Sequence, residues 1–329
     1  MNQLPLYPLR FEPIYQYRLW GGRRLSGLLS APLPGDEPVG EAWVLSDRTD
    51  YQSLVANGPL KGRSLGQLMD NSREQLMGEL ASRFARFPLL LKFLDAQTML
   101  SVQVHPSDAH PELIPAGDTA KTEAWVVIEA EKGSRIYAGL KSGTTASILR
   151  SSLEDETIAD HLVCIDPKPG DAVFIPAGTV HTLGDGVVVF EVQQNSDVTF
   201  RLYDWGHVDP KTKKTRPLQV DQAFACIEFG ASDSGLVSAR VETSAPVERE
   251  GLFDCDAFKL WRLLGQDRFT IGAKAEPRVL VCIAGSGQIM HKEDPYSVGK
   301  GDVWLLPAEA GVCAFEPSGE VTLLEIWIP

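Results

Sequence analysis

The sequence has no run of about 18 consecutive apolar residues, the length that a membrane-spanning helix requires. Residues 1–20 include Pro5, Pro8 and Pro13 and lack the apolar stretch of a secretion signal. Basic residues are outnumbered by acidic ones, 31 to 44, so the formal net charge is −13. Because this charge repels nucleic acids and anionic membranes, we expect neither as a partner. These features together predict a cytoplasmic protein.

Cysteine is also scarce, and no two cysteines lie close together in the sequence. The five cysteines are Cys164, Cys226, Cys255, Cys282 and Cys313. An odd, scattered set argues against a disulfide framework and is typical of buried free thiols in a reducing compartment.

Glycine and proline are plentiful, with 29 and 22 residues. Because both residues are typical of turns, they predict a chain with many turns, which favours a mainly β fold. The segment 170–177 resembles the segment 301–308, and an apolar strand pattern follows each copy. We therefore predict two β-barrel or jelly-roll units, residues 1–244 and 245–329. Helical spacing of apolar residues in segments 64–86 and 144–162 predicts small helical insertions in the first unit.

The segment 101–106 alternates polar and apolar residues, which is typical of a half-buried strand. Ser101, Gln103 and His105 should therefore face the same side. Pro106 should end the strand, because proline has no N–H group to donate to a neighbouring strand.

Glu123 and His181, on two later segments, can complete a metal site with Gln103 and His105. A set of nitrogen and oxygen donors without thiolate suits Zn²⁺, and also Mn²⁺, Fe²⁺, Co²⁺ or Ni²⁺. The spacing of the residues alone is a weak signal. The alternative is that the histidines make hydrogen bonds in the core, and the residue types alone leave both interpretations open.

Two basic residues are candidates for contact with a substrate. Lys121 precedes Glu123 by two residues, so it either holds a substrate phosphate beside the metal site or lies at the surface. Arg201 belongs to an alternating strand in which Thr199 and Tyr203 should share its face. That face points either to solvent or to a polar cavity.

Four segments in this order, 101–106, 121–125, 176–181 and 193–205, resemble the type I mannose-6-phosphate isomerases in their short bacterial form. Segment 39–46 resembles the N-terminal motif of that family, so the resemblance covers nearly the whole chain. It implies a cupin fold and one Zn²⁺ ion per chain, with Arg201 as the active-site arginine. The zinc ligands that it implies are Gln103, His105, Glu123 and His181.

The resemblance also implies a sugar phosphate substrate and an aldose–ketose isomerisation of mannose 6-phosphate through an enediol. We expect Lys121 and Ser101 to bind the substrate, while the base is either a nearby carboxylate or a metal-bound water. The chain departs from the family pattern at His207, near which a basic residue is usual, and at Gln219, where histidine is usual. Two alternatives are an Fe²⁺-dependent cupin oxygenase and a non-catalytic sugar-phosphate-binding cupin. Both a monomer and a homodimer are compatible with the sequence.

The second unit should bind no metal. His181 follows Pro176 by five residues, whereas the residue at the matching position after Pro307 is Val312. The sequence contains no histidine after His291, which we expect in an exposed loop.

Overall fold

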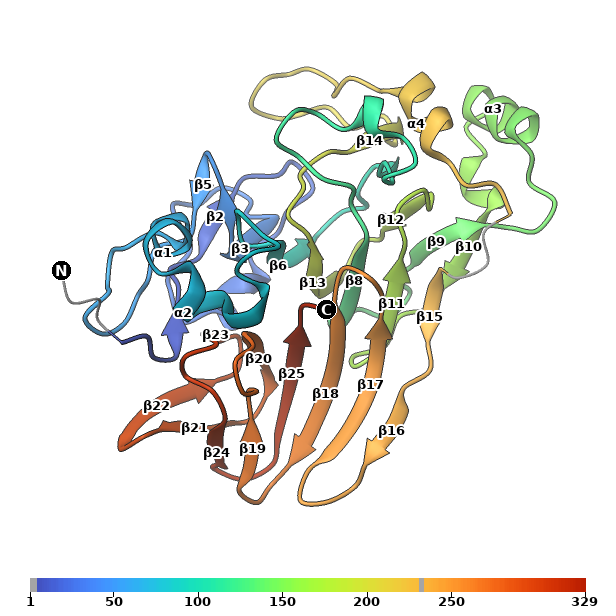
Figure 1. Ribbon diagram of the computed structural model, residues 1–329. Coiled ribbons are helices and arrows are strands. Elements are labelled where there is room, and N and C mark those ends of the chain that lie inside the picture. Colours follow the sequence, from blue (N-terminus) through green and yellow to red (C-terminus); the bar gives the residue numbers. More distant parts are fainter. Residues whose placement is uncertain (1–4, 231–233) are drawn as a thin grey trace.

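The computed structural model describes residues 5–230 and 234–329, and these residues form mainly β-strands, as predicted (Figure 1). Four sheets pack face to face, and we number them 1 to 4 in the order of stacking. Sheets 1 and 2 make up the first unit, and sheets 3 and 4 the second. A short hairpin of β4 (Asp47–Arg48) and β5 (Tyr51–Gln52) stands apart from the four sheets.

The first unit pairs a five-stranded sheet with a seven-stranded sheet. Sheet 1 contains, in spatial order, β10 (Leu162–Ile165), β9 (Ile136–Leu140), β12 (His181–Leu183), β7 (Val102–Val104) and β14 (Phe200–Tyr203). Sheet 2 contains β15 (Gly235–Val237), β11 (Ala172–Ile175), β8 (Glu123–Ala130), β13 (Val187–Gln194), β6 (Leu89–Ala96), β3 (Glu41–Leu45) and β2 (Ile14–Gln16). Two antiparallel sheets that face each other are typical of a jelly-roll barrel.

The second unit has the same two-sheet plan. Sheet 3 contains β1 (Leu9–Arg10), β23 (Val303–Leu306), β20 (Arg278–Ala284), β25 (Val321–Trp327), β18 (Lys259–Gly265), β17 (Glu248–Asp254) and β16 (Arg240–Thr243). Sheet 4 contains β19 (Phe269–Ile271), β24 (Cys313–Pro317), β21 (Ser286–His291) and β22 (Asp294–Gly299). The two repeated segments form β11 and β23. The chain leaves sheet 2 after β15 and enters sheet 3 with β16. Strand β1, near the N-terminus, also belongs to sheet 3.

Helices occupy both predicted insertions. The first contains α1 (Leu65–Asn71), α2 (Arg73–Met77) and η2 (Gly78–Leu80), and the second contains α3 (Ala146–Glu154) and η4 (Ile158–His161). Ser64 and Gln67 cap α1 reciprocally, since each side chain bonds the backbone N–H of the other. The remaining helical segments are η1 (Arg24–Gly27), η3 (Pro111–Leu113) and α4 (Val220–Cys226). Among the described residues, none of the helices has the length and apolar character needed to cross a membrane.

The inner sheets are buried on both faces. On β13, Val188 and Phe190 pack in the core between sheets 2 and 3, while Val187 and Val189 face sheet 1. Further cores lie between sheets 3 and 4 and on the outer face of sheet 1, under α3 and α4. A charged residue on the sheet 1 side of β13 or its neighbours is therefore enclosed by protein, and such a position is costly unless the charge has a partner.

Candidate active site

A cavity of about 370 Å³ lies between sheets 1 and 2. Its lining is rich in charged side chains from both sheets and the adjoining loops. The lining residues are Arg18, Trp20, Glu41, Lys92, Leu94, Leu100, Ser101, Gln103, Lys121, Glu191, Asp197, Thr199, Arg201 and Arg216.

His105, Glu123 and His181 converge beside this cavity, and one possible ligand atom from each lies within 4.8 Å of the others. The Nε2 atom of His105 is 3.3 Å from Oε2 of Glu123, and Nε2 of His181 is 3.3 Å from Oε1. All three side chains are at most 1% exposed. The structure therefore brings together three of the four predicted ligands as a possible metal site.

Backbone carbonyl groups fix the tautomers of the two histidines. The Nδ1 atom of His105 lies 2.8 Å from the carbonyl oxygen of Val198, and Nδ1 of His181 lies 2.9 Å from that of Thr179. Because a carbonyl can only accept, each Nδ1 carries the proton, and each Nε2 lone pair faces Glu123. Burial lowers the pKa of both imidazoles, with His105 at about 3, so both are neutral and able to bind a metal ion.

Neither carboxylate oxygen of Glu123 accepts a well-formed hydrogen bond, although both are buried. Burial alone would raise the pKa of Glu123, but the Lys121 ammonium, 2.7 Å away, holds it well below its usual range. The group is therefore an ionised carboxylate with unused lone pairs, and these suit a metal ion.

Gln103 is next to His181 in sheet 1, since the two residues are register partners on β7 and β12. Its amide nitrogen lies 3.1 Å from Nε2 of His181. A half-turn of the amide would place its oxygen at the same point, so Gln103 can supply a fourth donor. The predicted strand pattern of this segment is confirmed, because Val102 and Val104 pack on the outer face of the sheet.

The two predicted substrate-binding residues lie on the cavity wall, close to this centre. The Nζ atom of Lys121 contacts Oε2 of Glu123 at 2.7 Å and Nε2 of His105 at 3.0 Å. Ser101 is buried, and its hydroxyl lies 3.4 Å from the amide oxygen of Gln103.

Arg201 faces the cavity from β14, where it is the register partner of Gln103. Its Nε atom is buried and has no hydrogen-bond partner. A bulge between Arg201 and Tyr203 shifts the register, so Tyr203 pairs with Val102 and packs on the outer face. The prediction that Tyr203 shares the face of Arg201 is therefore wrong.

Gln219, one of the two departures from the family pattern, supports the backbone of Arg201. Its side-chain oxygen accepts a hydrogen bond from the Arg201 N–H group at 3.1 Å. Its own N–H group donates to the carbonyl oxygen of Arg201 at 2.9 Å. This residue contributes to the site by holding β14 rather than by lining the cavity.

The sequence interpretation did not single out a charged network on the floor of the cavity. Glu191 and Lys92 are register partners on β13 and β6, with Nζ of Lys92 3.2 Å from Oε1 of Glu191. Glu191 also accepts a hydrogen bond from Nε1 of Trp125 at 2.8 Å. Glu41 accepts from Arg18 at 2.8 and 3.1 Å. Charged residues inside apolar strands were the signal for Lys92 and Glu191.

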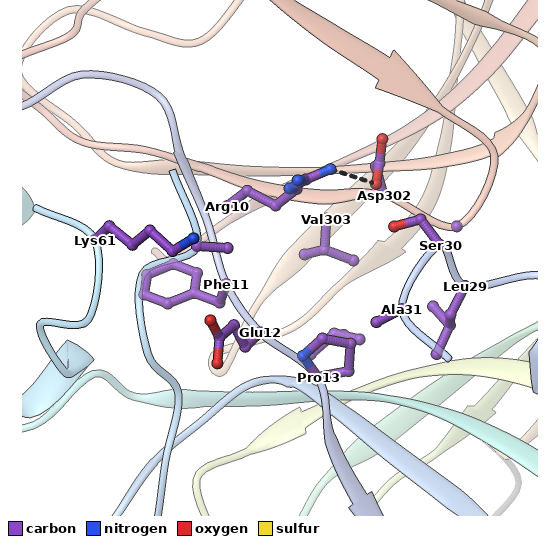
Figure 2. A pocket seen from close by; sticks show the side chains of 13 residues that line it. Arg10, Phe11, Glu12, Pro13, Leu29, Ser30, Ala31, Lys61, Asp302 and Val303 are labelled. Atoms are coloured by element: carbon purple, nitrogen blue, oxygen red, sulfur yellow. Dashed lines mark ion pairs between the residues drawn. The ribbon is translucent and has the colours of Figure 1, made fainter. Parts of the chain in front are cut away.

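A second cavity, of about 320 Å³, lies where the N-terminal segment meets the second unit (Figure 2). Arg10 and Asp302 form an ion pair of 3.5 Å across it, and Phe11, Pro13 and Leu29 supply much of its apolar wall. The group of possible metal ligands lies beside the other cavity, next to its lining residues Gln103 and Lys121, so we assign the candidate active site there.

A family model described as phosphomannose isomerase type I, catalytic domain, matches residues 9–139. The chain is 34% identical over 316 residues to the mannose-6-phosphate isomerase ManA of Bacillus subtilis, covering 95% of this chain and 97% of that protein. It is 34% identical to the mannose-6-phosphate isomerase of Streptococcus mutans, with coverage of 91% and 92%. The crystal structure of the Bacillus subtilis mannose 6-phosphate isomerase superposes with a TM-score of 0.88 at 28% identity, covering 97% of this chain and 99% of that one. The possible metal site beside the polar cavity is consistent with these matches. The chain belongs to the type I phosphomannose isomerase family.

Proposed function

We propose that this chain interconverts mannose 6-phosphate and fructose 6-phosphate, with a divalent metal ion held by Gln103, His105, Glu123 and His181. The observation that carries the proposal is the buried Glu123 carboxylate: Lys121 contacts Oε2, Oε1 accepts no hydrogen bond, and each oxygen lies 3.3 Å from the Nε2 atom of a neutral imidazole. Leaving such a group unsatisfied is costly, and a cation bound at this point would satisfy it. The donor set favours Zn²⁺, while Mn²⁺, Fe²⁺, Co²⁺ and Ni²⁺ accept the same ligands.

A divalent ion held by Gln103, His105, Glu123 and His181 would supply Lewis acidity for the isomerisation, in which a proton moves between C1 and C2 of the sugar. The chain itself must then provide a base that moves a proton between these two carbons. Glu191 is our candidate, because it lines the cavity and its burial raises its pKa, which makes it a better proton acceptor. Glu41 is less suitable, since Arg18 and Lys92 stabilise its ionised form and lower its pKa to about 2.

Three further residues have proposed roles in substrate binding and charge stabilisation. Lys121 lies against Glu123, so its ammonium group would donate to a substrate oxygen near C1 or C2. Ser101 would donate from the same wall of the cavity. Arg201, one strand away from the ligands, would stabilise the negative charge that develops on the enediolate oxygens.

The decisive experiment is a coupled assay of purified protein in which mannose 6-phosphate is the substrate and fructose 6-phosphate is detected. We expect turnover that requires a divalent ion, and loss of turnover in Glu191→Gln at unchanged metal content. Binding of mannose 6-phosphate without turnover would instead support a non-catalytic sugar-phosphate-binding cupin. Oxygen uptake on addition of Fe²⁺ would support an oxygenase.

A further inference from the structure

Lys121, the sequence-predicted phosphate anchor, already contacts Glu123 and His105, at 2.7 and 3.0 Å. It therefore lies at the metal end of the cavity rather than at a free cationic site. A six-carbon sugar phosphate carries its phosphate at the end opposite to C1. A different cation is needed at that end.

Three arginines line the cavity: Arg18, Arg201 and Arg216. Arg18 has little capacity left, because its guanidinium donates to both oxygens of Glu41 and to the carbonyl oxygen of Tyr17. Burial, followed by the charge of Arg216, lowers the pKa of Arg201, as expected for cations that lie close together.

Arg216 is oriented by a two-point ion pair with Asp204. Its Nε atom donates to Oδ2 at 2.9 Å, and Nη2 donates to Oδ1. No described residue accepts a hydrogen bond from the remaining Nη1 group. A guanidinium that one carboxylate holds in this way keeps donors available for a second, planar or tetrahedral anion.

The loop that carries Arg216 is fixed from its other side as well. The Tyr17 hydroxyl donates to Oδ1 of Asp209 at 3.2 Å, and Nζ of Lys211 lies 3.7 Å from the centre of the Tyr17 ring. Lys211 also pairs with Glu37. Arg216 therefore belongs to a pre-positioned loop, so ordering it on ligand binding should cost little entropy.

The width of sheet 1 from β12 to β14 is comparable with the length of an extended hexose phosphate. His181 and Gln103 lie on β12 and β7, and Arg201 lies on the next strand, β14. Arg216 is tied to the residue that follows β14 through its ion pair with Asp204. With about 4.8 Å between strands, β12 and β14 are roughly 10 Å apart. An open-chain hexose phosphate that lies across the strands would span this width, from the metal ligands towards β14 and the Arg216–Asp204 pair that follows it.

The charge of the cavity wall also suits a dianion. Five lining residues are basic and three are acidic, in a protein whose net charge is −13. We propose that Arg216 binds the phosphate group of the substrate and that Asp204 positions Arg216 to do so. The identity of the phosphate as part of a hexose 6-phosphate rests on the proposed function, whereas the anion site itself does not.

The test compares Arg216→Gln with Lys214→Gln, a matched loss of one charge from an exposed side chain of the same loop. We expect Arg216→Gln to raise KM for mannose 6-phosphate about 10- to 100-fold, as lost charge-assisted hydrogen bonds predict, with kcat changed little. The Ki of inorganic phosphate should rise by a similar factor. Lys214→Gln should leave both constants near the wild-type values.

Asp204→Asn tests the positioning role. It should raise KM less than Arg216→Gln does, and adding it to Arg216→Gln should raise KM no further. Arg216→Lys keeps the charge but loses the two-point pair, so its KM should lie between the values of the wild type and Arg216→Gln. This variant replaces Arg216→Gln in the test if Arg216→Gln does not fold. Wild-type KM in the Arg216 variants, or equal effects of Arg216→Gln and Lys214→Gln, would overturn the proposal.

A direct binding measurement separates this proposal from the proposed function. If the wild-type protein does not isomerise mannose 6-phosphate, ³¹P line broadening of inorganic phosphate still reports the anion site. Broadening that disappears in Arg216→Gln but persists in Lys214→Gln would support the site without the isomerase activity. Equal broadening in all three proteins would reject it.

Discussion

The Nζ atom of Lys92 lies 3.2 Å from Oε1 of Glu191, and both side chains are only 3% exposed. The two residues are register partners on neighbouring strands of sheet 2, and both point into the cavity of the first unit. Each of two opposite charges buried in this way offsets the cost of burying the other, and removing one of them leaves the other buried without a partner, which lowers the stability of the fold. This relationship leads to the first prediction.

Lys92→Met should destabilise the protein by about 3–5 kcal/mol, because it leaves the Glu191 carboxylate buried without its cation. Glu191→Gln should cost less, because its amide oxygen can still accept the Trp125 hydrogen bond, yet it should lower kcat by about 10²–10⁴ if Glu191 is the base. Urea unfolding and steady-state kinetics measure the two effects. Near-normal kcat in a folded Glu191→Gln protein would remove Glu191 from the mechanism.

Removal of the metal ion should abolish isomerisation, because the Lewis acid that the proposed mechanism requires would be lost. Exhaustive chelation followed by desalting should give an inactive protein, and Zn²⁺ or a similar ion should restore turnover. His181→Ala should bind little metal at all. Full activity after verified removal of the metal would contradict this prediction.

Local pattern was enough to predict the parts of the site that lie on single strands. Alternation in segment 101–106 placed Gln103 opposite Val102 and Val104, and the structure confirms it. Alternation failed at Tyr203, because a one-residue bulge reverses the faces of a strand and leaves no clear mark in the sequence. His291 was also misjudged: it is buried at the end of β21 rather than exposed in a loop.

The cross-strand partners of buried charged residues could not be predicted from the sequence. Lys92 and Glu191 are 99 residues apart, and their ion pair exists only because β6 and β13 are neighbours in register. The packing of sheet 2 against sheet 3 is equally non-local, and it is this packing that turns charged residues in apolar strands into buried groups. Charged residues within apolar runs could be recognised in the sequence, but their ion-pair partners could be identified only once the strand order was known.

The Glu41–Arg18 pair should stabilise the fold in a pH-dependent way. Burial opposes ionisation of Glu41, but Arg18 and Lys92 hold its pKa at about 2, below the usual 4.5. The folded state therefore binds fewer protons here than the unfolded state, and its advantage is complete above about pH 4.5 and lost on acidification towards pH 2. Urea unfolding at several pH values should show the wild-type protein losing its stability advantage over Glu41→Gln across this range. A constant difference would show that the ionised form of Glu41 is not what stabilises the fold.

Arg201 and Lys121 should act on the substrate rather than on folding. Arg201→Ala should mainly lower kcat, because its guanidinium is placed to stabilise charge that develops during the reaction. Lys121→Ala should mainly raise KM, as expected when a ground-state contact is lost. The melting temperature of Arg201→Ala should stay within a few degrees of wild type. That of Lys121→Ala should do so in the metal-loaded protein, where the bound ion still neutralises Glu123, and should fall after the ion is removed, because Glu123 is then buried without a cation. A variant that unfolds, or that keeps normal kinetics, would contradict the role assigned to its residue.

The purified protein should contain one tightly bound metal ion per chain, located in the first unit. The two repeated segments form equivalent strands, β11 and β23, but the position that corresponds to His181 is occupied in the second copy by Val312. Val312 is 59% exposed and has no donor atom. Between sheets 3 and 4 the side chains form an apolar core instead of a polar cavity. We therefore expect no metal ion in the second unit.

Elemental analysis of wild type, His181→Ala and His291→Gln tests this stoichiometry. His291 is the matched control, because it is a buried histidine of the second unit. We expect one ion per chain in the wild type and in His291→Gln, and almost none in His181→Ala. Two ions per chain in the wild type, with one of them lost in His291→Gln, would place a second metal site in the second unit and contradict its metal-free role. Because sheet 3 shares one apolar core with sheet 4 and another with sheet 2, we predict that the second unit has a structural role and supports sheet 2 of the first unit.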